Sequence, residues 1–190
     1  MEEVNPQLNR GRGRPKGPTT RPVIENLDVD IIKSWQQSPL KFIKDIWKLE
    51  PQPLKDEWKD VVELLIKSGH LNEIKEQYFD KFVKGKHLTW QQWLIMLAVE
   101  NRIGVKSVNR ISVVSGHSIG KSSSLSWLVI WYLFCHLDAQ IGATAPTSEQ
   151  IHDVLWKEIA LWVGRMPDQL KDLFDWQTGY IRMKERPGSW

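Results

Sequence analysis

Apolar side chains recur at helical spacing through the first half of the chain. Between residues 31 and 47 they return every three or four positions, and Ser38-Pro39 has the composition of an N-cap followed by a first helical turn. The same spacing predicts helices over residues 58–68 and 72–83, each followed closely by a glycine that can end it. We therefore expect a small helical region over residues 23–87.

The second half of the chain alternates between two kinds of pattern. Residues 90–101 have helical spacing, and residues 110–115 alternate as a strand does. Residues 121–136 are apolar nearly all round, which suits a helix buried inside an α/β domain. Residues 140–143 predict a second short strand. A strand, a buried helix and a further strand are typical of a parallel sheet with crossover connections.

The end of the chain continues this alternation. Thr147 to Gln150 has the composition of a capping box, and the apolar positions that follow mark one face of a further helix. Residues 178–190 contain one more short strand by the same criteria. The fold class that follows for residues 88–190 is α/β.

The amino-acid composition indicates what forms the core and in which compartment the protein is expected. A count of 11 tryptophans at a net charge of +3 is typical of a folded protein with large buried helical surfaces. Trp127, Trp131, Trp156 and Trp162 stand at helical spacing, so we expect them in the core rather than stacked on bases. Cys135 is the only cysteine, which excludes an internal disulfide and a cysteine-based zinc site. Because no stretch has the apolar core of a signal or a membrane span, we expect a cytoplasmic protein without a membrane partner.

The basic charge is concentrated at the start of the chain. Residues 1–22 are rich in proline and Gly-Arg and have almost nothing to bury, so we expect a disordered basic arm. Residues 12–18 contain the Arg-Gly-Arg-Pro core of an AT-hook, whose narrow backbone enters the minor groove of A·T-rich DNA. The candidate contacts to double-stranded DNA are Arg10, Arg12, Gly13, Arg14, Pro15 and Lys16. The alternative is a basic tail that contacts DNA phosphates without sequence preference.

The loop between the predicted strand and the buried helix has the composition of a phosphate-binding loop. Gly120-Lys121-Ser122 supplies the last three positions of the pattern G-x-x-x-x-G-K-[ST], in the strand-to-helix context that the motif requires. Backbone N–H groups of residues 117–122 are then expected to converge on the β-phosphate of ATP at a helix N-terminus. Lys121 would reach the β and γ oxygens as the catalytic residue, and the Ser122 hydroxyl would hold Mg²⁺.

The loop departs from the pattern at its first position. Ser115 stands where the first glycine is usual, and Gly116 one position later can give the chain its turn. The candidate nucleotide-binding residues of the loop are Gly116, His117, Ser118, Ile119, Gly120, Lys121, Ser122 and Ser123. The fold expected for residues 88–190 is therefore a partial P-loop NTPase domain with an incomplete parallel sheet. The alternative is a chance Gly-Lys-Ser sequence at an ordinary helix start.

The carboxylates that such a site uses for hydrolysis are harder to find. ATP hydrolysis in this class also needs a carboxylate on Mg²⁺, usually Asp-Glu at the end of a buried apolar strand. The downstream candidates lie in helical or turn contexts and none follows four apolar residues; they are Asp153, Glu158, Asp168, Asp172 and Asp175. We expect the chain to hold the first half of an ATPase domain, ending before that motif, or to bind nucleotide without hydrolysing it.

Four stretches together resemble the large terminase subunit of tailed bacteriophages, the ATPase and nuclease that packages viral DNA into procapsids. They are SPLKFIKDIWKLEP, LTWQQW, SGHSIGKSS and ATAPTSEQIHDVLWKEI, and the resemblance covers roughly residues 35–190, the N-terminal ATPase portion. It implies that the intact protein hydrolyses ATP with Mg²⁺ and cleaves DNA. It also implies a portal protein, a small terminase subunit, a ring of copies, and the cytoplasm of a bacterial host.

The resemblance assigns roles to five residues. In the family a Trp-Gln or Tyr-Gln pair ahead of the ATPase core contacts adenine, and Trp90-Gln91 match it. A plain buried anchor is the alternative for Trp90. His117 stands where the loop often carries a basic residue. Thr144 and Thr147 belong to a segment that faces the DNA or couples to it in related motors.

The chain also departs from the terminase pattern. Ser118 replaces a glycine common in similar loops, which narrows the conformations open to the loop. The family's Asp-Glu pair, its coupling motif and its nuclease domain have no counterpart in this sequence. Two other functions stay open: a helicase-like DNA translocase, and a non-catalytic adaptor that binds DNA or nucleotide.

Overall fold

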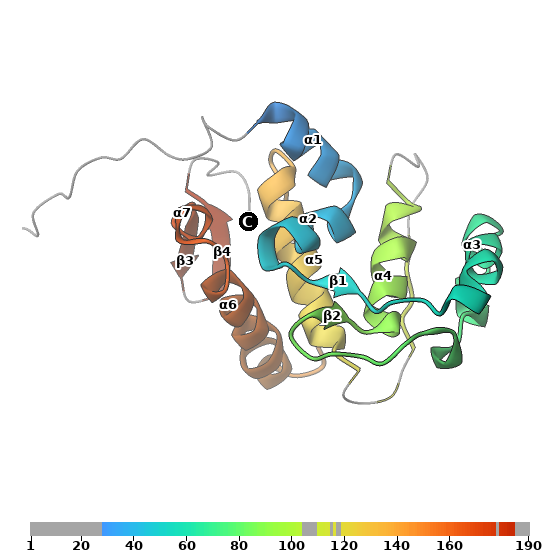
Figure 1. Ribbon diagram of the computed structural model, residues 1–190. Coiled ribbons are helices and arrows are strands. Elements are labelled where there is room, and N and C mark those ends of the chain that lie inside the picture. Colours follow the sequence, from blue (N-terminus) through green and yellow to red (C-terminus); the bar gives the residue numbers. More distant parts are fainter. Residues whose placement is uncertain (1–27, 104–109, 115, 117–118, 178, 185–190) are drawn as a thin grey trace, which may run out of the picture.

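The computed structural model describes residues 28–103, 110–114, 116, 119–177 and 179–184 (Figure 1). The predicted basic arm, with its AT-hook sequence and DNA contacts from Arg10 to Lys16, lies outside these residues. So do Ser115, His117 and Ser118 of the predicted loop.

The first two helices form where the periodicity predicts them. Helix α1 spans Val29–Gln37 and α2 spans Pro39–Trp47. Ser38 separates them, because its extended backbone ends one helix while its side chain accepts a hydrogen bond from the Lys41 N–H of the next. Pro39 occupies the first helical position, where its missing N–H costs nothing. The predicted cap is confirmed.

The next segment confirms one predicted helix and contradicts another. Helix α3 covers Lys59–Lys67, and Gly69 follows it with a φ of 77°. The helix predicted over residues 72–83 is wrong, since this segment forms two short 3₁₀ turns and extended backbone instead. Its main chain has partners elsewhere: Tyr78 O accepts from Lys55 N and Asp80 N donates to Pro53 O. These tertiary bonds outweigh the helical spacing.

A short parallel pair of strands precedes α4. Strands β1, Glu50–Pro51, and β2, His87–Leu88, pair in parallel over two residues. Helix α4, Trp90–Glu100, follows at once and begins with a complete capping box, in which Thr89 and Gln92 exchange hydrogen bonds. The predicted helix at residues 90–101 is confirmed.

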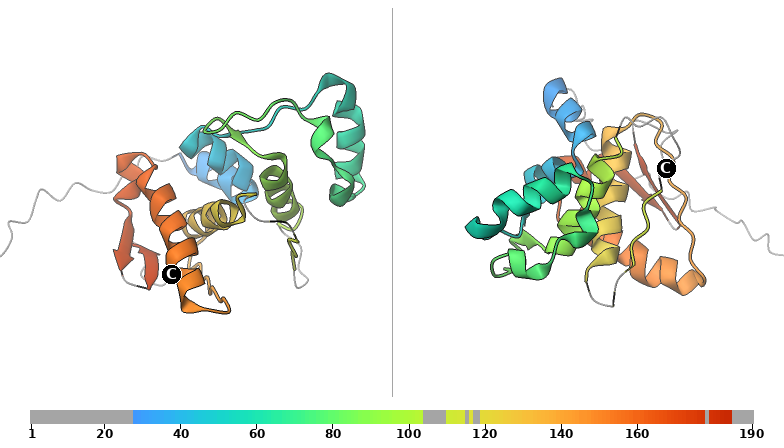
Figure 2. Two further views of the ribbon diagram at one scale, coloured as in Figure 1. Left: turned by 90° about the horizontal axis from the view of Figure 1, so that it is seen from below. Right: turned by 90° about the vertical axis from the view of Figure 1, so that its right-hand side faces the viewer.

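Helix α5, Lys121–Cys135, is the central element of the fold. Helices α1, α2, α4 and α6 and strand β4 pack around it (Figures 1 and 2). It buries eight residues, and six of them, including Trp127, Trp131 and Cys135, belong to the larger of two apolar clusters. The sequence prediction of a buried helix with core tryptophans is confirmed here.

The last elements form a layer beside α5. A π-helical turn, Gln150–Trp156, continues as α6, Lys157–Gly164, and α7 covers Asp168–Lys171. Strands β3, Phe174–Gln177, and β4, Tyr180–Met183, then pair antiparallel. The short strand predicted near the end is confirmed as β4; its partner β3 is an addition. The predicted capping box contributes a bond from Gln150 N to the Thr147 hydroxyl at 3.4 Å.

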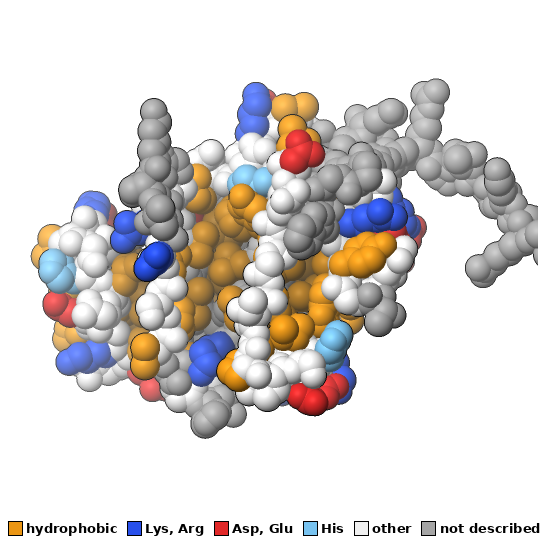
Figure 3. Space-filling model, turned by 180° about the vertical axis from the view of Figure 1, so that it is seen from behind, with side chains coloured by type: hydrophobic (Ala, Val, Ile, Leu, Met, Phe, Trp, Pro, Cys, Tyr) orange, Lys and Arg blue, Asp and Glu red, His pale blue; other side chains and the backbone are white. Residues whose placement is uncertain are grey.

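The two strands predicted to flank α5 are wrong within the described residues. Residues 110–114 and 140–143 are extended but belong to no strand, and both segments lie on the same side of α5 (Figure 2). A strand needs a main-chain partner, and neither segment has one in the part of the chain that the structure describes. Seen from behind, the surface between them is hollowed and largely apolar (Figure 3). The fold is thus mixed α/β, with helices dominating and its sheets small.

Among the described residues, no helix is both long and apolar enough to cross a membrane.

Candidate nucleotide-binding site

The predicted loop ends at a helix N-terminus, as its motif requires. Gly120 precedes α5 with φ 79° and ψ 28°, a left-handed conformation that glycine adopts without strain. The N–H groups of Lys121, Ser122 and Ser123 then stand in the first turn, where no intrahelical carbonyl reaches them. The helix dipole adds a partial positive charge at this end, which favours an anion.

Lys121 folds back over the loop. Its Nζ donates a hydrogen bond to the Gly116 carbonyl at 2.6 Å, and the two residues are five positions apart along the chain. The ammonium group therefore lies on the loop and not along the helix surface. In this position it can exchange a carbonyl oxygen for a phosphate oxygen over a short movement.

Trp90 and Gln91 reach the loop through a cavity. This cavity, of about 330 Å³, lies between α4, residues 111–114 and Ile119, and both side chains line it. Its wall is mostly apolar, with the Gln91 amide among its few polar groups. A space with mostly apolar walls and the amides of Gln91 and Asn72 suits a flat heteroaromatic ring.

Trp90 also has the packing of a buried anchor. Its indole stacks on Phe79, with ring centroids 6.2 Å apart at 23°, inside the smaller apolar cluster around α3. The indole N–H is buried and has no hydrogen-bond partner among the described residues. Trp90 therefore both packs in the smaller apolar cluster and lines the cavity.

Ser123 points away from the loop. Its hydroxyl donates to Glu158 Oε2 at 2.9 Å, and the same oxygen accepts the Trp162 indole N–H at 3.0 Å. These bonds connect the first turn of α5 to α6. Gln92, Ser123 and Glu158 all line the cleft at this place. Glu158, a carboxylate next to the loop helix, is therefore already engaged by two donors.

Thr144 and Thr147 lie in the extended segment that leads to the π-helical turn, and both are exposed. The Glu149 backbone N–H and the Thr147 hydroxyl hold the pKa of the Glu149 carboxyl below its usual value. The turn consequently begins with a retained negative charge, which its N–H groups favour. The structure places these threonines apart from the cavity that Trp90 and Gln91 line.

Comparison with known proteins adds no relative. No family model, curated protein or solved structure matches this chain. Its chemistry has to be inferred from the loop and the residues around it.

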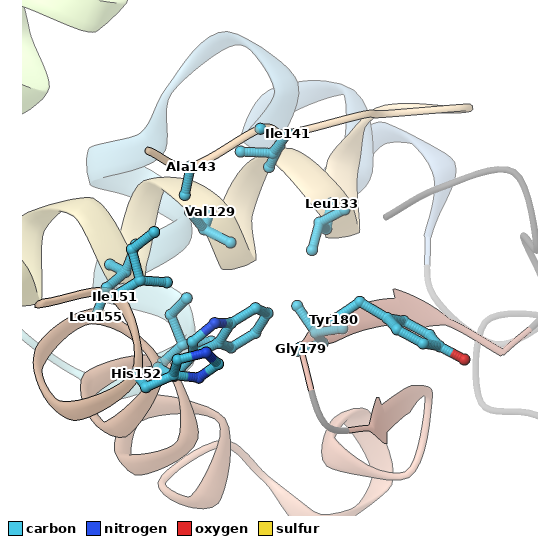
Figure 4. A pocket seen from close by; sticks show the side chains of 13 residues that line it. Val129, Leu133, Ile141, Ala143, Ile151, His152, Leu155, Gly179 and Tyr180 are labelled. Carbon is cyan, nitrogen blue, oxygen red and sulfur yellow. The ribbon is translucent and has the colours of Figure 1, made fainter. Parts of the chain in front are cut away.

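A second cavity lies directly against α5. It has a volume of about 370 Å³ and lies between α5, residues 141–143, the π-helical turn and β4 (Figure 4). Val129 and Leu133 face Ile151 and Leu155 across it, and the Tyr180 hydroxyl turns outward. Its walls are mostly aliphatic, so they offer an anion little.

Two contacts that hold the loop helix in place were not predicted from the sequence. Gln92 is buried and donates through Nε2 to the Gly120 carbonyl at 3.3 Å. The spacing of Thr89 and Gln92 is that of a capping box, so the role of Gln92 in α4 was readable from sequence. Its contact with Gly120 and the contact of Glu158 with Ser123 join distant parts of the chain, and no local pattern encodes them.

Proposed function

We propose that this chain binds ATP with Mg²⁺ through a variant P-loop and forms the N-terminal part of a terminase-type motor that moves double-stranded DNA into a procapsid. The supporting observation is that a group of N–H and ammonium donors and a largely apolar cavity lie next to the same loop. A helix N-terminus and a lysine folded onto Gly116 supply groups for phosphates. The adjoining cavity with Trp90 and Gln91 supplies room for a base.

The roles of the residues follow from their positions. The first-turn N–H groups of α5 and the Lys121 ammonium would bind the β- and γ-phosphates, and Gln91 would bond to the edge of adenine. The Ser122 hydroxyl, in the same turn, would be a ligand of Mg²⁺, which neutralises phosphate charge when bound. Such an ion keeps several waters, so a single protein hydroxyl is compatible with its coordination.

The remaining parts of the proposal concern the intact motor. Arg10 to Lys16 would contact the DNA, and Thr144 and Thr147 would pass movement between nucleotide and DNA. A portal protein, a small terminase subunit and further copies of the chain would be its partners in the cytoplasm of a bacterial host. These roles rest on the resemblance of the four sequence stretches described above.

A second candidate function is a nucleotide-binding or DNA-binding adaptor without hydrolysis. The engagement of Glu158 by Ser123 and Trp162 favours it, because this carboxylate next to the loop helix is not free to orient water. A helicase-like translocase would use the same loop. It would carry helicase motifs instead of a nuclease domain.

Calorimetric titration of the chain with ATP and Mg²⁺ tests the proposed function. Lys121→Ala removes the ammonium group, and the loss of a charged hydrogen bond is expected to weaken ATP binding about tenfold to a hundredfold. Lys67→Ala is the matched control, since Lys67 lies on α3 and pairs with Glu63. Equal ATP affinity in the wild type and in Lys121→Ala, or no ATP binding by the wild type, would overturn the proposal. ATP binding without turnover would favour the adaptor.

A further inference from the structure

Gln92 is held at both ends of its amide. It is the third residue of α4, only 7% exposed, and its Oε1 accepts the Thr89 backbone N–H at 3.0 Å. The opposite end, Nε2, donates to the Gly120 carbonyl. The capping box therefore fixes the side chain, and the fixed side chain presents one N–H to the last residue of the loop.

The Gly120 carbonyl accepts hydrogen bonds from three donors. Besides Gln92, it accepts the Ser124 backbone N–H at 3.0 Å and the Ser124 hydroxyl at 3.2 Å. Ser124 is itself buried. Three donors thus hold the oxygen toward the helix body and toward α4.

Holding this oxygen also sets the direction of the next N–H. In a planar trans peptide, the carbonyl of one residue and the N–H of the following residue point in opposite directions. The inward Gly120 carbonyl therefore turns the Lys121 N–H outward, toward the open end of α5. That N–H belongs to the first turn, where no intrahelical acceptor competes for it.

We infer that Gln92 is a positioning residue for phosphate binding, which orients the 120–121 peptide group and couples it to α4. The inference rests on the proposed function and adds a residue to it. Trp90 and Gln91, on the base side, share the first turn of α4 with Gln92. Movement of that turn is transmitted to the phosphate side through a single buried amide.

The shape of the contact supports this role. A Cβ added to Gly120 would stand well inside contact distance of Gln92 Nε2, so the amide occupies the space that any other residue would need. The positive φ of Gly120 imposes the same restriction through the backbone. Position 120 is therefore adapted to the neighbouring amide as well as to the turn.

Binding of inorganic triphosphate with Mg²⁺ to the full chain tests the inference, because this probe has no base. Gln92→Glu keeps the acceptor for Thr89 and replaces the donor by a carboxylate that repels the Gly120 carbonyl. Gln92→Met keeps the length of the side chain and has no donor. We expect both variants to bind triphosphate about tenfold more weakly, which corresponds to the loss of one well-placed hydrogen bond.

Gln36→Met is the control. Gln36 is also a partly buried glutamine, and its Nε2 donates to the Cys135 carbonyl at 2.7 Å, at the opposite end of α5 from the loop. A general loss of buried amide bonds would lower the melting temperature in all three variants. Only loss of positioning would weaken triphosphate binding in the Gln92 variants alone, at a temperature where circular dichroism shows every variant folded.

The outcomes separate the inference from the function beneath it. If the wild type binds triphosphate and Lys121→Ala does not, the function stands. Unchanged binding by folded Gln92→Glu or Gln92→Met then overturns the inference alone, as does equal weakening in Gln36→Met. If the wild type binds neither ATP nor triphosphate, both fall together.

Discussion

Two glycines with nearly the same backbone conformation differ in what surrounds them. Gly120 has φ 79° beside Gln92, whereas Gly85 has φ 82° and no atom within 4 Å of an added Cβ. We predict that Gly85→Ala lowers the free energy of unfolding by about 1–2 kcal/mol, the cost of a left-handed alanine. Gly120→Ala should cost about 1–3 kcal/mol more, because its methyl group displaces Gln92. Urea unfolding of both variants measures the difference.

The double variant Gly120→Ala/Gln92→Ala supplies the control for this residue pair. Removing the amide should recover the steric part of the Gly120→Ala loss and leave the backbone part. Equal losses in Gly85→Ala and Gly120→Ala would contradict the close contact between Gly120 and Gln92.

At the scale of elements, α1 is fastened to α5 by two hydrogen bonds. The Trp131 indole N–H donates to Trp35 O at 2.6 Å, and Gln36 Nε2 donates to Cys135 O at 2.7 Å. Trp131→Phe keeps an aromatic ring and removes the indole N–H. We predict a loss of about 1 kcal/mol or more in unfolding free energy, since the replacement also leaves space in the core. Amides of α1 should exchange faster with solvent, before those of α6 do.

Trp176→Phe is the control variant for Trp131→Phe. Trp176 is 41% exposed on the outer hairpin, where its ring packs edge-on against Trp156. We expect its replacement to change the unfolding free energy by about 0.5 kcal/mol or less. The same exchange rates for α1 in both variants would show that the Trp131 bond does not fasten this helix.

At the scale of the whole molecule, the apolar surface behind α5 is the feature that most favours self-association. Val114 is 95% exposed beside the half-exposed Ile111 and Val113, along an extended segment without a strand partner among the described residues. Exposed apolar surface next to free strand edges promotes association. We predict that the chain self-associates as its concentration rises, and that Val114→Lys shifts sedimentation toward the monomer.

Leu64→Lys tests whether that association is specific to this surface. Leu64 is 67% exposed, but it lies on α3, away from α5. A similar effect of the two lysine variants, or a wild type that stays monomeric at every concentration, would contradict the prediction.

The sequence by itself determined most of the helices and where they begin and end. Helices α1 to α5 and the main contribution of tryptophan to the core follow from spacing and caps, because a helix satisfies its hydrogen bonds within its own segment. The loop motif and its place before α5 were likewise readable, whereas the resemblance alone pointed to Trp90 and Gln91. Each of these features depends on residues within about four positions of one another.

The tertiary structure alone decided what depends on distant partners. Residues 110–114 and 140–143 alternate as strands but pair with nothing in the described chain, since a strand takes its hydrogen bonds from another segment. Residues 72–83 have helical spacing, yet main-chain bonds to residues 53–55 hold part of them extended. The contact of Gln92 with Gly120 joins residues 28 positions apart. Only folding brings such groups within the 3 Å or so that a hydrogen bond requires.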